Sequence, residues 1–343
     1  MTLSYKYKHF IQQNTAPKGT KAIGVYKDGV KVTEIPLGRM TPPDTEPLYT
    51  FGLVSDVHIG ASNISAYGYS WTKFDNTLSY FESIGCDFCV ITGDLTVTGL
   101  YTQAGEDYLD VTQFAKYKEI CDRYDLPIYD LMGNHESYYG MPIKNNLDLM
   151  ETYTGRGVLS YTFEQGEDVF ILCGQPQDNH VMTAADFSWL GTTLEANKNR
   201  RCFVFIHPYI EEDSGDPLDI RENSIFDDRF WGAANRNDFI NLLGQYPNVI
   251  LFHGHSHMKF EYQEYDVNAN YTERNGFKSV HIPSLVTPRD ITFDENGNAV
   301  KAVDDRNASQ GYIVDVYKDC IVLNGMDFVN NEPIPLGTYK IDT

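Results

Sequence analysis

Two histidines in the second half of the chain have the type and spacing of a metal site. His255 and His257 follow residues 249–252, an apolar run typical of a buried strand, and Gly254 allows a sharp turn after it. Residues two apart in an extended segment project to the same side, so both imidazoles can reach one point. Neutral imidazoles are common ligands of transition metals. The sequence therefore predicts a metal site at the end of this strand.

Four earlier strand-like runs end in side chains of the same kind. They are residues 49–55, 88–92, 128–132 and 202–206, and the metal-competent residues that follow them are Asp56 and His58, Asp94, Asn134 and His135, and His207. A mixture of carboxylate oxygens, amide oxygens and imidazoles is typical of sites for Mn, Fe, Zn or Co. It is not typical of a structural zinc site, which thiolates hold. Because eight such side chains are too many for one ion, we expect two ions bridged by a carboxylate, an arrangement suited to phosphoryl transfer.

Segments with helical periodicity lie between these strands, and the helices they predict would hold the carboxyl ends of the strands in place. Apolar residues recur at helical spacing within residues 70–84, 114–124, 186–196 and 238–243. Buried strands that alternate with amphipathic helices predict an α/β fold, in which ligands bind at the carboxyl ends of the strands. A short strand at residues 280–282 and a hairpin of residues 311–317 and 320–324 are expected to complete the chain.

Composition limits the classes of function. The 343 residues carry a net charge of −21, and no Lys/Arg-rich run is present, which argues against a broad nucleic-acid-binding surface. The same charge repels anionic substrates, so phosphate chemistry needs a local positive centre, and a metal ion can supply it. We therefore expect a small phosphoester substrate.

The sequence also predicts a cytoplasmic protein without a membrane partner. No apolar run approaches the ~18 residues of a membrane-spanning helix, and residues 1–10 do not resemble a signal peptide. The six cysteines lie mostly in apolar surroundings, and Cys86 and Cys89 form a single CxxC without a second pair. We interpret them as buried, reduced thiols. No pattern indicates an oligomeric state.

The first 47 residues differ from the rest of the chain. Residues 22–26 and 30–35 alternate around Lys27-Asp28-Gly29, which predicts a hairpin, and residues 39–47 contain three prolines and are typical of a linker. We expect residues 1–47 to be an appendage without chemistry of its own, and residues 48–343 to form the functional domain.

Taken together, the motifs resemble the calcineurin-like metallophosphoesterases. That family carries D-x-H, G-D, G-N-H-(D/E), H and G-H-x-H, each after a strand, and this chain has all five in order within residues 49–257. The resemblance implies a four-layer sandwich, with two central mixed β-sheets flanked by helices and a dinuclear metal site at the strand ends.

The resemblance also implies a role for each motif residue. Asp56, His58 and His257 would bind the first metal; Asn134, His207 and His255 would bind the second; and Asp94 would bridge the two. His135 would act on the leaving oxygen of the substrate, and a metal-bridging hydroxide would be the nucleophile. An imidazole placed there is also a plausible general acid on chemical grounds.

Departures from the family patterns narrow the choice of subfamily. Asp94 is followed by Leu95-Thr96-Val97-Thr98-Gly99, without the arginine of the protein Ser/Thr phosphatases. Val97 stands where purple acid phosphatases have Tyr, and His58 is a residue they lack. The chain therefore resembles the broad phosphodiesterase/phosphohydrolase branch of the family, and a phosphodiesterase is the expected activity. A phosphomonoesterase of the same family, and a phage-encoded accessory or structural protein that retains the domain, remain as alternatives.

Residues outside the metal-ligand motifs are expected to select substrate, to support the site or to stabilise the fold. Residues 209–236, which leave from His207 and include Tyr209 and Trp231, form either a substrate-selecting lid or a loop pinned to the core by its aromatic residues. We expect Glu136 to support the site. The histidines outside the motifs are expected to be structural; they are His9, His180, His253 and His281.

Overall fold

The computed structural model describes most of the chain. The described residues are 22–27, 30–36, 45–60, 70–97, 109–136, 143–174, 182–210, 233–264, 269–274, 276–293 and 299–343. Among the helices of these residues, none is long and apolar enough to cross a membrane.

The first central sheet has seven strands and joins the two ends of the domain. Its order is β16-β15-β14-β3-β4-β5, and β17 also pairs with β15. Strands β3 (Tyr49–Val54), β4 (Phe88–Ile91) and β5 (Ile128–Asp130) run parallel. The antiparallel strands are β14 (Gln310–Val316), β15 (Cys320–Asp327), β16 (Glu332–Pro333) and β17 (Tyr339–Asp342).

The second central sheet has six strands in the order β10-β11-β9-β8-β7-β6. Strands β7 (Asp168–Cys173), β8 (Cys202–Ile206), β9 (Val249–His253) and β11 (Phe277–His281) are parallel neighbours. The edge strands β6 (Ser160–Gln165) and β10 (Tyr271–Arg274) are antiparallel to their partners. Both sheets are therefore mixed, as predicted.

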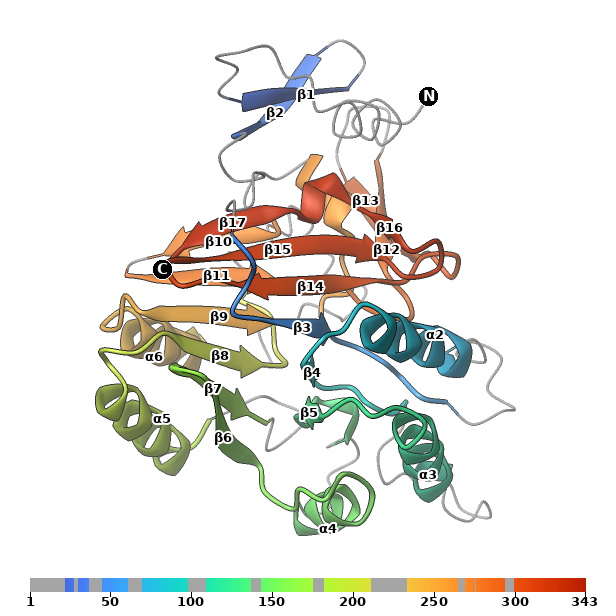
Figure 1. Cartoon of the computed structure of the whole chain (residues 1–343), viewed down its shortest axis with the longest axis vertical. Helices are drawn as coiled ribbons and strands as arrows, with labels where there is room; N and C mark the ends of the chain where they lie inside the picture. Colours follow the sequence, from blue (N-terminus) through green and yellow to red (C-terminus); the bar gives the residue numbers. More distant parts are fainter. Residues whose placement is uncertain are drawn as a thin grey trace.

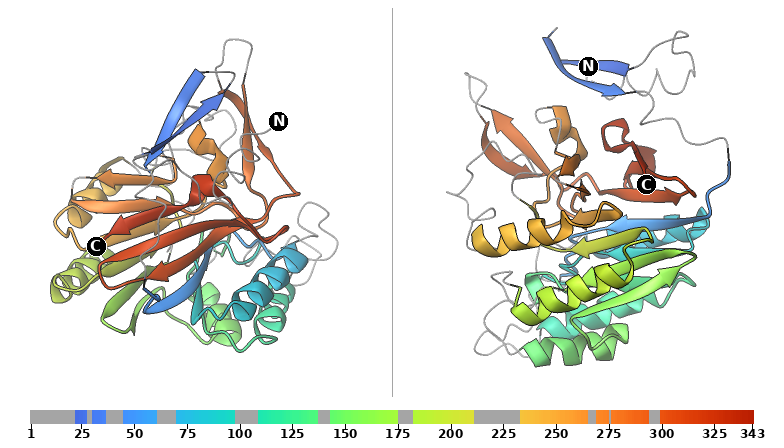
Figure 2. Two further views of the ribbon diagram at one scale, coloured as in Figure 1. Left: turned by 45° about the horizontal axis from the view of Figure 1, so that its top comes forward. Right: turned by 90° about the vertical axis from the view of Figure 1, so that its left-hand side faces the viewer.

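Helices cover the outer face of each sheet and make the fold a four-layer sandwich. Helices α2 (Ser70–Ser83), α3 (Leu109–Cys121) and α4 (Ile143–Thr154) pack on the outer face of the seven-stranded sheet. Helices α5 (Ala184–Ala196) and α6 (Ala233–Leu243) cover the six-stranded sheet. In the right-hand view of Figure 2, α5 and α6 lie in front of the strands and α2 lies behind them (Figures 1 and 2). The predicted architecture is confirmed.

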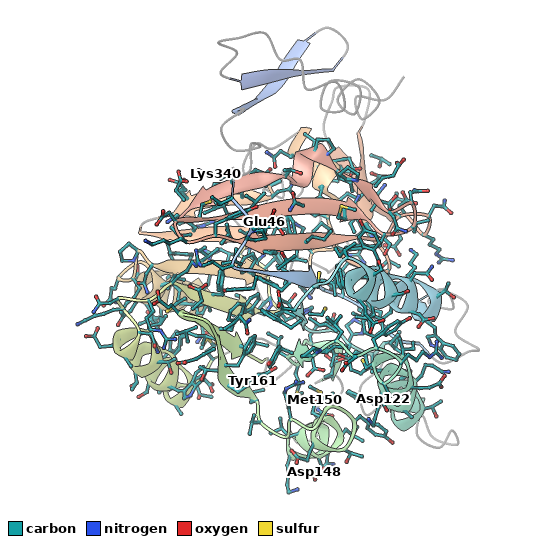
Figure 3. The ribbon with its side chains drawn as sticks, in the orientation of Figure 1. Glu46, Asp122, Asp148, Met150, Tyr161 and Lys340 are labelled. Atoms are coloured by element: carbon teal, nitrogen blue, oxygen red, sulfur yellow. The ribbon has the colours of Figure 1, made fainter. Side chains whose placement is uncertain are left out.

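The space between the two sheets is filled largely by aromatic rings. Phe51 of β3 stacks on Phe88 of β4 with ring centroids 5.1 Å apart, and Phe205 stacks on Phe252 at the same distance in the other sheet. Val204, one residue from Phe205, packs under the helices instead, because successive side chains of a strand point to opposite faces. Figure 3 shows side chains filling the space between the layers, whereas Asp122, just after α3, and Asp148 of α4 project outward.

The structure corrects several boundaries. Helix α6 begins at Ala233 and not at residue 238, because its first turn contains no large apolar residue to mark it. Helix α4 and the strand pair β12 (Arg289–Phe293) and β13 (Ala299–Asp304) were not predicted. The N-terminal hairpin of β1 (Ala22–Lys27) and β2 (Val30–Pro36) is confirmed, whereas its status as a separate appendage stays a prediction.

Candidate metal centre

The loops that follow β3, β4, β5, β8 and β9 meet at one edge of the sandwich and bring the predicted residues together. Six carboxylate and imidazole side chains form two buried groups, in each of which the ligand atoms lie within 4.8 Å of one another. One group is Asp56, His58, Asp94 and His257, and the other is Asp94, His207 and His255. Asp94 belongs to both.

In the first group, the Nε2 atoms of two imidazole rings point toward each other. His58 Nε2 lies 3.1 Å from His257 Nε2, and His257 Nε2 lies 3.0 Å from Asp56 Oδ1. The Asp94 carboxylate completes this side at 3.7 Å from His58 Nε2. Two imidazole nitrogens that point at each other beside two carboxylates form a set of converging lone pairs, which a cation satisfies.

The second group repeats this arrangement around His207. Its Nε2 atom lies 3.1 Å from Asp94 Oδ2, 3.1 Å from His255 Nδ1 and 2.9 Å from the side-chain oxygen of Asn134. Asn134 thus joins this group, although it is neither acidic nor basic. The donor set is one carboxylate, one amide oxygen and two imidazoles, which suits a transition-metal ion.

Groups behind the imidazoles fix their orientation. His207 Nδ1 lies 2.8 Å from the carbonyl oxygen of Thr92, and His257 Nδ1 lies 2.9 Å from Thr287 Oγ1. Because these acceptors hold the Nδ1–H, they leave the Nε2 lone pair aimed into the cluster, as in metal sites where an outer partner orients the ligand. Neither threonine was identified from the sequence, because nothing in the pattern around it marks this contact.

The backbone is strained at the same positions. Six non-glycine residues in the described part of the chain have positive φ, and five of them belong to the cluster: Asp56 (55°), His58 (45°), Asp94 (51°), His255 (69°) and His257 (60°). A left-handed conformation is costly for residues other than glycine, and such strain gathers at functional sites. Its concentration here is independent support for a functional role of the cluster.

Two motif glycines permit the loops to approach one another. A Cβ atom on Gly133 would collide with the Asp94 carboxylate, and one on Gly254 would collide with the Ser55 side chain. Each glycine therefore lets one strand end pass directly against another. The glycines of the G-N-H and G-H-x-H motifs serve packing of the site, not only turning of the chain.

Electrostatics keep the carboxylates ionised. Burial alone would raise the pKa of Asp94, but His207 and His135 hold it well below its usual value. Burial alone would lower the pKa of His207. The carboxylates of Asp94 and Asp56 outweigh this effect and raise the pKa to about 9. Burial and the neighbouring His207 both lower the pKa of His255, to about 3. A bound cation would replace the proton on His207 and neutralise the carboxylates.

His135 lies at the mouth of the cluster. Its side chain is 18% exposed, compared with 7% for His257 and 1% for His58, so it is the most accessible of these three imidazoles. His135 Nδ1 contacts the Val97 carbonyl oxygen, and its Nε2 atom lies 3.7 Å from Asp94 Oδ2. The ring is thus held with Nε2 toward the cluster.

Glu136 joins two of the ligand loops, in agreement with its expected supporting role. Its carboxylate accepts hydrogen bonds from the Thr96 backbone N–H at 2.9 Å, the Thr96 hydroxyl at 3.1 Å and the Gly133 backbone N–H at 2.8 Å. These bonds fix the loop after β4 against the loop after β5, and so fix Asp94 relative to Asn134.

The remaining histidines and the start of the expected lid have structural surroundings. His253 and His281 are buried, and His281 Nε2 lies 2.5 Å from Ser256 Oγ, a contact that supports the loop between the two histidine ligands. Tyr209 is buried and its ring stacks on His255 with centroids 5.9 Å apart, so it pins the chain to the core. His9, His180 and residues 211–232 lie outside the described residues.

The cysteines do not contribute to the site. All six are free, and Cys86 and Cys89 are buried, with pKa values that burial raises. The interpretation of the CxxC as buried thiols is confirmed.

Comparisons with known proteins agree with this geometry. A family model described as calcineurin-like phosphoesterase matches residues 49–280. The fold is similar to a dimetal phosphatase from Danio rerio (TM-score 0.57, 14% identity, 87% of this chain and 99% of that one). It is also similar to a purple acid phosphatase from yellow lupin seeds (TM-score 0.56, 13% identity, 88% of this chain and 55% of that one). The comparison with curated proteins gave no match.

Proposed function

This chain belongs to the calcineurin-like phosphoesterase family and is a phosphoester hydrolase by class; we propose that it hydrolyses small phosphodiesters with the aid of two transition-metal ions. The observation that carries the proposal is the position of Asp94, whose carboxylate belongs to both buried groups. A carboxylate shared by two sets of imidazoles is the arrangement expected of a bridging ligand in a two-metal site.

The donor set supports a specific assignment of ligands. Asp56, His58 and His257 would hold one ion and Asn134, His207 and His255 the other, with Asp94 between them. The mixture of oxygen and imidazole donors fits Mn, Fe or Zn. Such ions, when bound, supply Lewis acidity and lower the pKa of a coordinated water toward neutrality.

His135 would act on the leaving group. Its Nδ1 atom contacts the Val97 carbonyl oxygen, which leaves Nε2 directed toward the cluster. A protonated Nε2 can donate its proton to the departing oxygen, a role that typically contributes ~10²–10⁴-fold. Burial lowers the pKa of His135, so this contribution is expected to be greatest at acidic pH.

Charge favours a diester over a monoester. A phosphomonoester is largely dianionic at neutral pH and a diester is monoanionic, so a chain with a net charge of −21 repels the monoester more strongly. The segment after Asp94 also lacks an arginine that would bind the extra charge. We further propose a cytoplasmic location, which the six free cysteines support.

A metal analysis combined with a substrate pair tests the proposal. Protein loaded with Mn, Fe or Zn should contain two ions per chain and should hydrolyse bis(p-nitrophenyl) phosphate with a higher kcat/KM than p-nitrophenyl phosphate. The reverse preference would identify the monoesterase alternative. Two bound ions without turnover of either ester would favour the accessory or structural protein.

A further inference from the structure

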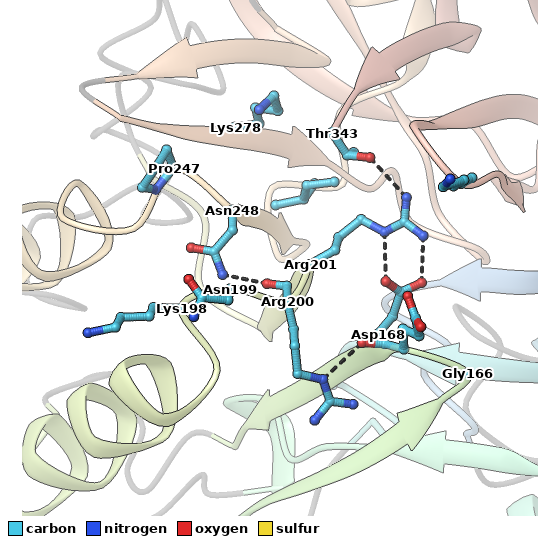
Figure 4. Close-up of a pocket in the computed structure, with 13 residues that line it drawn as sticks. Gly166, Asp168, Lys198, Asn199, Arg200, Arg201, Pro247, Asn248, Lys278 and Thr343 are labelled. Atoms are coloured by element: carbon cyan, nitrogen blue, oxygen red, sulfur yellow. Dashed lines mark hydrogen bonds and ion pairs between the residues drawn. The ribbon is translucent and has the colours of Figure 1, made fainter.

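A second candidate site lies at the opposite end of the sandwich from the metal centre. A cavity of about 620 Å³ opens where the β6–β7 turn, the segments before β8 and β9, and the β14–β15 turn come together. Figure 4 shows Arg200 and Arg201 near its centre, with Lys278 of β11 on the far side of the view from Arg200. The volume is within the ~300–1,000 Å³ typical of small-molecule sites.

The cavity is distant from the metal centre. Arg201 precedes β8 and His207 follows it, so six residues of extended chain separate the two. At about 3.3 Å per residue, this corresponds to roughly 20 Å. A ligand in the cavity therefore cannot touch the metal ligands, and the cavity is not an extension of the site already described.

The charge of the lining is opposite to that of the chain. Five of the 13 lining residues are basic and two are acidic, whereas the whole chain has 27 basic and 48 acidic residues. In a protein that is otherwise strongly negative, this is a local positive surface to which anions are drawn.

Three of the five basic residues are held in place by carboxylates. Arg201 makes a bidentate pair with Asp168, at 3.0 Å from Nε and 2.6 Å from Nη2, and both side chains are about nine-tenths buried. Arg200 pairs with Glu164 at 2.6 Å, and Lys198 pairs with Glu195 at 2.5 Å. The buried Arg201–Asp168 pair fixes one side of the cavity, and the three pairs together leave little net charge from these residues for a ligand.

The other two basic residues are available to a ligand. Lys278 comes from β11 of the six-stranded sheet, and Lys318 from the turn between β14 and β15 of the seven-stranded sheet. Neither forms an ion pair with a carboxylate within the described residues. Both lysines line the cavity, and each carries a charge to which a phosphate group is drawn.

The rest of the lining indicates what the phosphate is attached to. None of the described lining residues is aromatic, so the cavity offers no surface on which a nucleobase would stack. It offers the side-chain amide of Asn199 and the hydroxyl of Thr343 instead, groups that bind hydroxyls. We propose that the cavity is a non-catalytic site for a phosphorylated polyol, such as a sugar phosphate.

Calorimetric titration of the metal-loaded protein tests this assignment. The probe is the methylene phosphonate analogue of glucose 6-phosphate, which cannot be hydrolysed at the metal centre. Wild type should bind it, and the double variant Lys278→Ala/Lys318→Ala should lose affinity at least tenfold while its turnover of bis(p-nitrophenyl) phosphate and its melting temperature stay unchanged.

A matched control removes the same charge elsewhere. Lys118→Ala/Lys144→Ala takes away two lysines on α3 and α4, whose side chains are 44% and 77% exposed, and should bind the probe as wild type does. Equal affinity of the cavity double variant and wild type would overturn the proposal, as would the absence of binding to wild type. Equal binding of methylphosphonate or of AMP would show that the cavity does not recognise a polyol.

Discussion

The residues that adopt positive φ differ between the two ends of the sandwich. At the amino-terminal ends of the parallel strands, the chain turns through glycines with positive φ, such as Gly166 before β7 and Gly276 before β11. At the carboxyl-terminal ends, Asp and His residues take up positive φ themselves. The first end avoids strain, and the second accepts it in order to aim side chains that carry chemistry.

Charge shows the same contrast. The buried carboxylate of Asp168 is neutralised within the protein by Arg201, and it also accepts a 2.5 Å hydrogen bond from Tyr49. The buried carboxylates of Asp56 and Asp94 face imidazoles instead, two of which point their nitrogens at each other. One end is complete as the polypeptide folds, and the other has the donor atoms of a site that cations would complete. The predictions below test this difference.

The largest effect is expected for Asp94→Ala. Because Asp94 belongs to both ligand groups, its removal should lower the metal content from two ions per chain and abolish turnover, whereas loss of a ligand from one group should spare the other ion. The measurement is metal content per chain with turnover of bis(p-nitrophenyl) phosphate. Asp122→Ala, at an exposed position just after α3, is the control. A variant that keeps both ions would contradict the bridging role.

The next largest effect is expected for His135→Ala, which should keep both ions and lose ~10²–10⁴-fold in turnover of diesters with poor leaving groups. The loss should be smaller for p-nitrophenyl esters, whose leaving group needs no proton. A loss of equal size for good and poor leaving groups would argue against proton donation.

The pH profile provides a second measure of the same residue. His135 acts in its protonated form, so its contribution is present below its pKa and lost as the pH rises through it. Burial lowers that pKa from 6.5, so the fall for poor leaving groups should begin below pH 6.5. The fall should be absent from His135→Ala. A variant that retains it would assign the titration to another group.

A smaller effect is expected for Thr287→Val, which keeps the shape of the side chain and removes the hydroxyl that orients His257. Outer partners of this kind typically change metal affinity or activity by ~10–100-fold. Because the Thr287 carbonyl oxygen also lies 3.2 Å from His257 Nδ1, the lower limit is expected. Chelator competition measures the affinity, and Thr193→Val on α5 is the control. Identical metal affinities of Thr287→Val and wild type would show that Thr287 does not support metal binding.

No effect on metal content or turnover is expected for Arg201→Met, at the other end. It should instead lower the free energy of unfolding by ~3–5 kcal/mol, because the Asp168 charge stays buried without its partner. Urea denaturation measures the loss, and Arg201→Met/Asp168→Asn should restore part of it. A double variant no more stable than the single one would show that the uncompensated charge is not the cause.

The sequence predicted the residues of the buried Asp/His cluster more completely than the fold around it. Asp56, Asp94 and His255 were recognisable because each follows an apolar strand, and the pleat and the strand order bring such ends to one edge. Thr287 was not recognisable, because its contact with His257 depends on the path of the loop after β11. Helix α4 was missed although Leu147, Met150 and Tyr153 recur on it at helical spacing, and β12 and β13, which form a separate two-stranded sheet, were missed as well.

The structure of the manganese-loaded protein tests the central claim most directly. The account predicts two ions ~3.5–4 Å apart, the spacing typical of two-metal sites. It also predicts that the Asp94 carboxylate contacts both ions, with Asp56, His58 and His257 around one and Asn134, His207 and His255 around the other. A single ion, or an Asp94 carboxylate that contacts neither ion, would contradict it.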